Sequence, residues 1–155
     1  MSFNSYRKAM ELVEDCEDFE VGEGVSEEYL ASVEARLGIE FSPIHRDFLL
    51  NYGYMCFCGY EIFGIAEDTP EDAEPWGNLL LYTLAERERA NLPLDMFPVT
   101  AYDDGCIAYL DHEFITDGEP KVVVAIYNGA HYITIDKNRA ADLGDFLLNL
   151  VEKCL

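Results

Sequence analysis

The sequence predicts an α+β fold in a single domain, because helical and strand patterns occupy separate parts of the chain. Amphipathic helical patterns fill the first third and the C-terminal end, and alternating strand patterns lie between them. The chain has 155 residues, of which 50% are apolar, with 9 Phe and 10 Tyr. That length and that supply of apolar side chains are enough for one core without a disulfide or metal. We therefore expect one domain over residues 1–155.

Three helices are predicted before residue 54. The first carries an apolar stripe and is expected to end near Asp18, followed by a connector at residues 19–25. The second begins after Ser26, a favourable N-cap, and ends at Gly38, where a left-handed residue is common. The third begins at Pro43 and ends by residue 53, and we interpret its His45 as a solvated or N-terminal helix histidine.

Strands and two more helices complete the predicted fold. Aromatic and β-branched residues spaced by glycines favour one or two short strands in residues 54–65. Residues 78–91 favour a helix by propensity, although parts of that segment could also lie in a strand. Residues 97–136 alternate around two turn signals, which predicts a meander of about four antiparallel strands. A strong apolar stripe predicts a final helix over residues 143–154.

The charge of the chain excludes several kinds of partner. Against 31 Asp and Glu stand 10 Lys and Arg, a formal net charge of −21. Residues 11–35 hold ten acids and no Lys or Arg, and residues 67–74 hold five acids. Nucleic acids and anionic membranes bind basic surfaces, so neither is an expected partner. A basic protein is the expected one.

The sequence contains no export signal and no pattern typical of disulfide or metal crosslinks. It contains no apolar run of membrane-spanning length, and residues 1–9 lack the apolar core of a signal peptide, so we expect a cytoplasmic protein. Five cysteines at irregular spacing favour reduced, partly buried thiols. Cys56 and Cys58 would share one face of an extended strand, and their spacing is not that of a zinc site. We expect core packing for both and no bound metal.

No motif supports catalysis or a cofactor. Cys106 with His112 or His131 is the least implausible nucleophile and base, but Cys106 follows a turn as an ordinary half-buried strand residue would. Glycine-rich phosphate loops are missing from the sequence, and the acids of residues 67–74 do not follow calcium-loop spacing. We predict no catalytic residue and no cofactor.

Aromatic side chains beside clustered acids are the candidate binding residues. Trp76 follows the acidic segment by two residues, and Tyr102 precedes Asp103 and Asp104. Such anchors surrounded by one charge sign are common in binding hot spots, although a solubilising loop and a Trp packed in the core would give the same pattern. The predicted partner-binding residues are Glu67, Asp68, Glu71, Asp72, Glu74, Trp76, Tyr102, Asp103 and Asp104.

Three segments carry short motifs that occur together in one protein family. Residues 25–65 contain Glu34, Leu37-Gly38, Pro43 and Phe48-Leu49 in that order. Residues 97–111 contain a strand, an acidic turn with Gly105, and an aromatic before Asp111. The third segment is the strand at Pro120 and the closing helix, where Leu143 replaces a frequent aromatic. Over about residues 24–152 the chain thus resembles the SUKH superfamily, which contains bacterial immunity proteins and fungal cell-wall-synthesis regulators.

The resemblance implies a strongly curved, mostly antiparallel sheet flanked by N-terminal helices and a C-terminal helix. It also implies a protein that binds other proteins without catalysis or a cofactor. Family members in bacterial toxin systems neutralise a cognate toxin, often a nuclease, by binding it. We therefore expect an immunity protein for a basic toxin. An intracellular regulatory adaptor that holds a basic cellular protein is the alternative.

Overall fold

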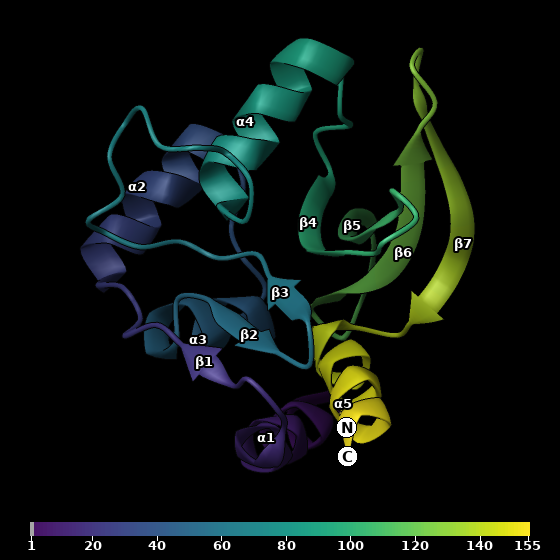
Figure 1. Cartoon of the computed structure of the whole chain (residues 1–155). Helices are drawn as coiled ribbons and strands as arrows, with labels where there is room; N and C mark the ends of the chain where they lie inside the picture. Colours follow the sequence, from purple (N-terminus) through teal and green to yellow (C-terminus); the bar gives the residue numbers. More distant parts are fainter. Residues whose placement is uncertain (1) are drawn as a thin grey trace.

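Two antiparallel sheets and five α-helices make up residues 2–155, the part of the chain that the computed structural model describes. Figure 1 shows the first and last helices side by side at one end of the molecule. The larger sheet lies on one side and the remaining helices, with the smaller sheet, on the other. The predicted α+β fold is confirmed.

The first and last helices form the base of the molecule. Helix α1 covers Ser2–Leu12 and continues as a short 3-10 turn, η1 (Val13–Asp15), while α5 covers Leu143–Cys154 and packs against α1. The sequence predicted that this first helix ends near Asp18, which is beyond the observed end. The backbone becomes extended at Cys16 and left-handed at Asp18, where φ is 55°, so the helix cannot continue there.

The smaller sheet has the order β1-β2-β3, with strands Glu20–Val21, Met55–Phe57 and Tyr60–Ile62. Residues 19–25, predicted as a connector, thus contribute a short edge strand whose Glu20 pairs with Cys56. The two short strands predicted in residues 54–65 are confirmed. Strand β2 ends at Phe57, however, and Cys58 lies in the turn with φ 49°. Cys56 and Cys58 therefore do not share the face of one extended strand.

Helices α2 (Glu27–Leu37) and α3 (Pro43–Asn51) have the predicted boundaries. The hydroxyl of Ser26 accepts a hydrogen bond of 3.1 Å from the Tyr29 backbone, and Gly38 ends α2 with φ 73°. At the start of α3 the side chain of Glu119 accepts a 3.2 Å hydrogen bond from the Ile44 backbone. A carboxylate from the larger sheet thus satisfies an N-terminal amide of α3.

His45 is not the solvated residue that the sequence suggested. It is buried on α3 and contacts the ring of Phe41 edge to face, with ring centroids 4.9 Å apart. Burial is the main reason that the pKa of His45 falls to about 3, because the charged imidazolium cannot be hydrated there. His45 is therefore a neutral core residue at neutral pH.

The larger sheet is the predicted meander, with the order β4-β5-β6-β7 and every neighbour antiparallel. Its strands are Met96–Ala101, Ile107–Thr116, Glu119–Tyr127 and Tyr132–Ala140. Helix α4 (Leu79–Ala90) precedes it, with Asn78 as N-cap and a left-handed Asn91 at its end. The helical interpretation of residues 78–91 is confirmed.

Both faces of this sheet are buried at its centre, but against different partners. The face in the main core, which we call the inner face, carries Phe97, Val99, Ala108, Leu110, Val122 and Val124. The opposite face, the outer face, has a small separate cluster that includes Met96, Ile107, Tyr109, Val123 and Ala125. Tyr82 of α4 packs against this second cluster. Alternate residues of β5 and β6 thus enter two different apolar clusters.

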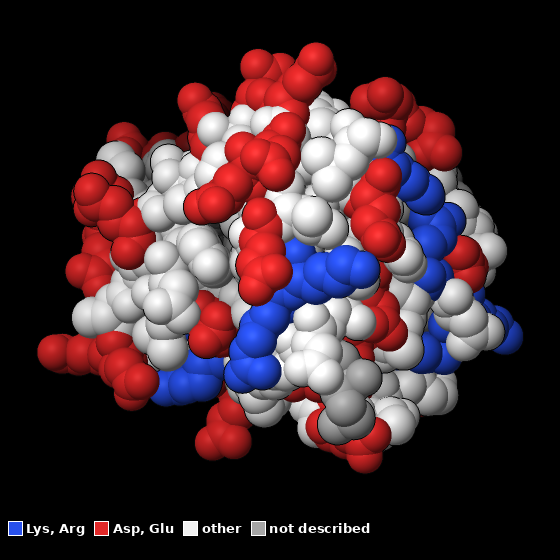
Figure 2. Space-filling model, turned by 90° about the horizontal axis from the view of Figure 1, so that it is seen from below, with Lys and Arg blue, Asp and Glu red and all other residues white. Residues whose placement is uncertain are grey.

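Acidic side chains are not confined to one face. Figure 2, which looks onto the base of the molecule, shows them around the whole visible surface with a few Lys and Arg between them. Within residues 2–155, each helix is too short or too polar to cross a membrane. Acids are therefore spread over this face as well as on the acidic loop, and a binding face must be distinguished by features other than charge alone.

Candidate binding surface

A pocket of about 240 Å³ lies between α4 and the outer face of the larger sheet, and we call it the outer-face pocket. Trp76 and Tyr102, the two aromatic residues singled out in the sequence, both line it. Tyr82 of α4 and Tyr109 and Tyr132 of the sheet also contribute. Residues far apart in sequence therefore meet in an aromatic hollow, as is common in protein recognition sites.

Trp76 is not packed into the core, since 56% of it is exposed. Its indole nevertheless contacts two rings edge to face, that of Phe63 with centroids 5.4 Å apart and that of Tyr82 at 5.7 Å. Edge-to-face pairs of this kind restrict an aromatic side chain. The Trp76 side chain is thus exposed to solvent but already restrained. Binding of a partner therefore costs little of its side-chain conformational entropy.

The acidic loop, residues 67–74, leads to Trp76 and is fastened at both ends. At its start, Glu67 accepts a 2.6 Å hydrogen bond from the Ser26 backbone, and this bond is the main reason that the pKa of Glu67 is lowered. Beyond its end, the Gly77 carbonyl accepts a 3.1 Å bond from Gly64. All five acids are exposed. The loop therefore holds its charges in a defined position beside Trp76.

One of the two carboxylates in the second acidic turn has a structural role. Asp104 accepts a 3.0 Å hydrogen bond from the Cys106 backbone, which lowers the pKa of Asp104 and closes the turn before β5. Asp103 and Asp104 are both exposed and line a shallow hollow with Tyr102. Replacing Asp104 would disturb the turn as well as the charge, so Asp103 is the better probe.

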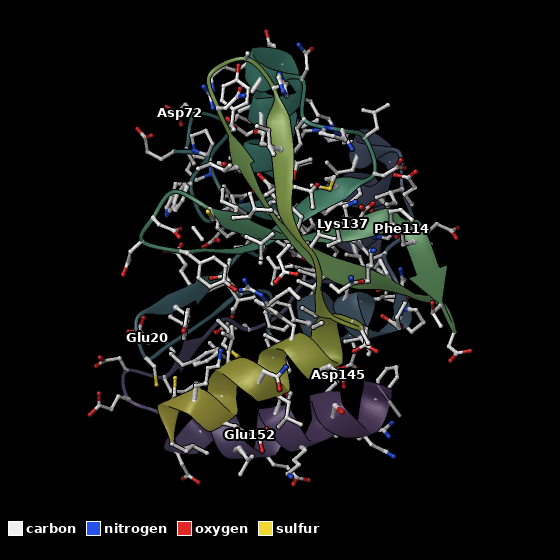
Figure 3. All side chains as sticks on the ribbon, turned by 90° about the vertical axis from the view of Figure 1, so that its right-hand side faces the viewer. Glu20, Asp72, Phe114, Lys137, Asp145 and Glu152 are labelled. Atoms are coloured by element: carbon white, nitrogen blue, oxygen red, sulfur yellow. The ribbon has the colours of Figure 1, made fainter. Side chains whose placement is uncertain are left out.

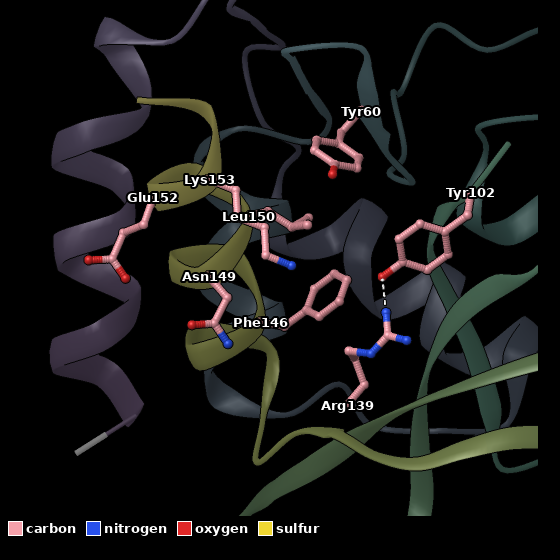
Figure 4. A pocket seen from close by; sticks show the side chains of 8 residues that line it. All are labelled: Tyr60, Tyr102, Arg139, Phe146, Asn149, Leu150, Glu152 and Lys153. Atoms are coloured by element: carbon pink, nitrogen blue, oxygen red, sulfur yellow. Dashed lines mark hydrogen bonds between the residues drawn. The ribbon is translucent and has the colours of Figure 1, made fainter.

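Tyr102 connects the outer-face pocket to a neighbouring hollow of about 410 Å³ beside α5. Figure 4 shows this hollow, with the ring of Phe146 facing Arg139 and the hydroxyl of Tyr60 directed inward. Arg139 donates a 2.9 Å hydrogen bond to the Tyr102 hydroxyl and lies over its ring. Sequence reasoning missed Arg139, because it comes from β7 and no local pattern links it to Tyr102.

A buried carboxylate lies at the wall of the outer-face pocket. Glu86 of α4 forms an ion pair of 2.6 Å with Arg89 and accepts a 2.7 Å hydrogen bond from the Tyr132 hydroxyl. Burial raises the pKa of Tyr82 to about 12 and raises that of Tyr132 further. These tyrosines therefore stay neutral and contribute ring surface and hydroxyl groups. The sequence alone could not have selected Glu86 from among the many acids.

The predicted site residues do not all share one pocket. Glu67 and Asp68 line a different hollow of about 550 Å³, between the acidic loop and residues 21–24. Figure 3 labels Asp72 at the end of the molecule opposite to Asp145 and Glu152 of α5. The structure brings Trp76 and Tyr102 together in one pocket, whereas Glu67 and Asp68 line another hollow and Asp103 and Asp104 a third.

The residues considered for catalysis are not arranged for it. Burial raises the pKa of the Cys106 thiol, which opposes formation of a thiolate nucleophile. In residues 2–155, Cys106 makes no side-chain hydrogen bond to His112 or His131. Cys106 and these histidines therefore do not form a nucleophile with its base.

The fold agrees with the comparison to protein families. Residues 6–152 match the SUKH_5 family, described as SMI1-KNR4 cell-wall. The chain belongs to this family. The match starts earlier than the resemblance seen in the sequence and so includes most of α1. No curated protein matches the chain.

Proposed function

We propose that this SUKH-family protein binds and neutralises a basic toxin domain through the surface around Trp76 and Tyr102. Immunity proteins are typical of the family, whose members are generally not enzymes. One observation carries the choice of surface: Trp76, 56% exposed, lines the same pocket as Tyr102. A held, exposed Trp beside a hollow is a common anchor in binding hot spots.

The acids around this surface support a cationic partner. The chain carries a net charge of −21, and the five acids of residues 67–74 stand directly before Trp76. A basic cleft, such as a nuclease uses for phosphate, would be attracted to these carboxylates and lose its access to substrate once covered. Charge of this kind mainly accelerates association, to about 10⁸–10⁹ M⁻¹s⁻¹ at low salt, while the aromatic centre slows dissociation.

A regulatory adaptor that binds a basic cellular protein is the second candidate. The description of the matching family as SMI1-KNR4 cell-wall favours it, because that description names no toxin. The same surface would serve either partner, since both are basic. The two functions differ in the gene context, where an adjacent gene for a large secreted protein with a variable C-terminal domain supports immunity.

Coexpression tests the proposal directly. The chain is produced together with the toxin domain encoded next to its gene, and growth rescue and copurification are scored. A matched pair of variants locates the surface: Glu71→Lys with Asp72→Lys, against Glu11→Lys with Glu14→Lys on exposed positions of α1 and η1. Both pairs change the net charge equally. We expect rescue by the wild type and weaker complex formation only with the loop pair.

Failure of the wild type to rescue growth or to form a complex would transfer support to the adaptor. Equal loss of binding in both variant pairs would show that total charge, and not the acidic loop, attracts the partner.

A further inference from the structure

Three cysteines from distant parts of the chain converge beside the base of the molecule. Cys16 follows η1, Cys58 lies in the turn between β2 and β3, and Cys154 is the last residue of α5. Their three sulfur atoms all lie within 4.8 Å of one another. Nothing in the proposed binding surface uses these thiols.

The fold holds the three segments together by several contacts. The packing of α1 against α5 brings Cys16 and Cys154 to the same end, and the Cys16 thiol faces the Val151 carbonyl of α5 at 4.0 Å. The Cys58 backbone donates a 2.8 Å hydrogen bond to Glu17, next to Cys16. In Figure 3 the end of α5 marked by Glu152 lies on the same side of the molecule as Glu20 of β1. The cluster is thus part of the folded structure.

The spacing of the sulfurs suits a metal ion. Three sulfurs bound about 2.3 Å from one ion lie about 3.8–4.0 Å apart in tetrahedral or trigonal geometry. Sulfurs within 4.8 Å of one another need to move by less than about 1 Å each to reach that arrangement. Cys16 is buried, while Cys58 and Cys154 are half-buried, so an ion can reach the cluster from the solvent side.

We propose that Cys16, Cys58 and Cys154 form a three-sulfur site for a thiophilic d¹⁰ ion, Zn²⁺ or Cu⁺. Soft thiolate ligands select these ions over Mg²⁺ and Ca²⁺, which prefer the oxygen ligands that this acidic chain offers everywhere else. On binding, three sulfur–metal bonds form and three S–H bonds break, with the protons released to solvent. A trigonal ion needs no further ligand, and a tetrahedral one takes a water as its fourth.

The environment of the cluster is consistent with this chemistry. Burial raises the pKa of Cys154 to about 12 and also raises that of Cys16. In the metal-free chain these thiols are therefore protonated, and Asp15 adds a negative charge close to Cys16. A bound cation would stabilise the thiolates that burial disfavours. The protonated thiols are accordingly unsuited to nucleophilic attack.

Metal titration of the reduced, full-length chain under anaerobic conditions tests the proposal. Zn²⁺, Cu⁺ and Cd²⁺, the last as a spectroscopic probe, are added separately in the presence of excess Mg²⁺, which occupies surface carboxylates. We expect one ion per chain and, with Cd²⁺ and Cu⁺, ultraviolet absorption from sulfur-to-metal charge transfer. Competition between Zn²⁺ and Cu⁺ identifies the ion that is held more tightly.

Cys56 offers a matched control, since it is half-buried on the adjacent strand β2 and lies outside the cluster. Cys58→Ser should lower the affinity for Cd²⁺ by more than about 100-fold, because even loss of a residue that only supports a ligand costs about 10–100-fold. Cys56→Ser should leave the affinity unchanged. Circular dichroism of both variants checks that they fold.

Alkylation of the unmodified chain gives a readout that needs no variant. The metal should protect Cys58 and Cys154 from alkylation and leave the reactivity of Cys56 unchanged. The proposal is overturned if the wild type shows no charge-transfer absorption with Cd²⁺ and Cu⁺. It is equally overturned if Cys58→Ser binds like the wild type, or if the metal protects Cys56 as well as the cluster.

Discussion

The inner and outer faces of the larger sheet are built from the same strands but differ in how completely they are covered. The inner face is sealed in the main core, where Phe97 and Leu110 are fully buried. The outer face has only a small cluster beneath α4 and opens into the pocket lined by Trp76 and Tyr102. We therefore infer that the inner face contributes most of the stability of the fold. The outer face leaves aromatic side chains exposed for recognition.

The inner face should dominate stability. Replacing Phe97 by Ala removes a fully buried ring and should lower the free energy of unfolding by about 3–5 kcal/mol. Trp76→Ala, at a residue 56% exposed that contacts two rings, should cost less, about 1–2 kcal/mol. Denaturant titration of both variants measures the contrast. Equal losses would mean that Trp76 is a core residue, and the contrast between the faces would fail.

Acid sensitivity should also come from the core side of the molecule. The pKa of buried His45 is about 3, below its ordinary value of about 6.5, so the unfolded chain binds a proton that the folded chain rejects. This contribution to stability is complete above pH 6.5 and decreases as the pH falls toward 3, by at most about 1.4 kcal/mol per pH unit.

Comparing pH-dependent stability between variants isolates that contribution from the many carboxylates. His45→Leu should unfold with a smaller loss of stability between pH 6.5 and 3 than the wild type. His131→Gln, at an exposed position in the turn before β7, should retain the wild-type pH dependence. An unchanged slope in His45→Leu would contradict the neutral, buried state of His45.

The pocket wall should contribute less than either core residue. Tyr132→Phe removes the hydroxyl that donates a 2.7 Å hydrogen bond to Glu86, while the ion pair with Arg89 remains. We expect a loss of about 1 kcal/mol in the free energy of unfolding, measured with denaturant. Tyr127→Phe removes the hydroxyl of another ring of the same pocket and serves as control. Equal effects of the two variants would show that the bond to Glu86 adds nothing specific.

Local signals predicted the elements well, because their causes are local. Ser26 and Gly38 bound α2 as expected, since a cap and a left-handed residue act within one turn. Alternation located the meander but could not assign its faces. Both Leu110 and Tyr109 are apolar and buried, yet they enter different clusters, and only the packing of α4 distinguishes them.

The candidate site depended on long-range packing and could be predicted only in part. Charge and aromatic content selected Trp76 and Tyr102 from the sequence, and the structure places both on one pocket. Arg139 and Glu86 were missed because their partners lie far away in the chain. The cysteine cluster was missed for the same reason. Cys58 leaves its strand at a left-handed turn, which the extended interpretation of residues 54–65 did not include.

Binding kinetics of the Trp76→Ala variant with the cognate toxin domain test the central claim most directly. Truncation of a central aromatic anchor should weaken the complex by at least about 2 kcal/mol, or about 30-fold in Kd, mainly through faster dissociation. The free energy of unfolding should fall by only about 1–2 kcal/mol, which leaves the variant folded. Dissociation at the wild-type rate would contradict the assignment of the outer-face pocket as the binding site.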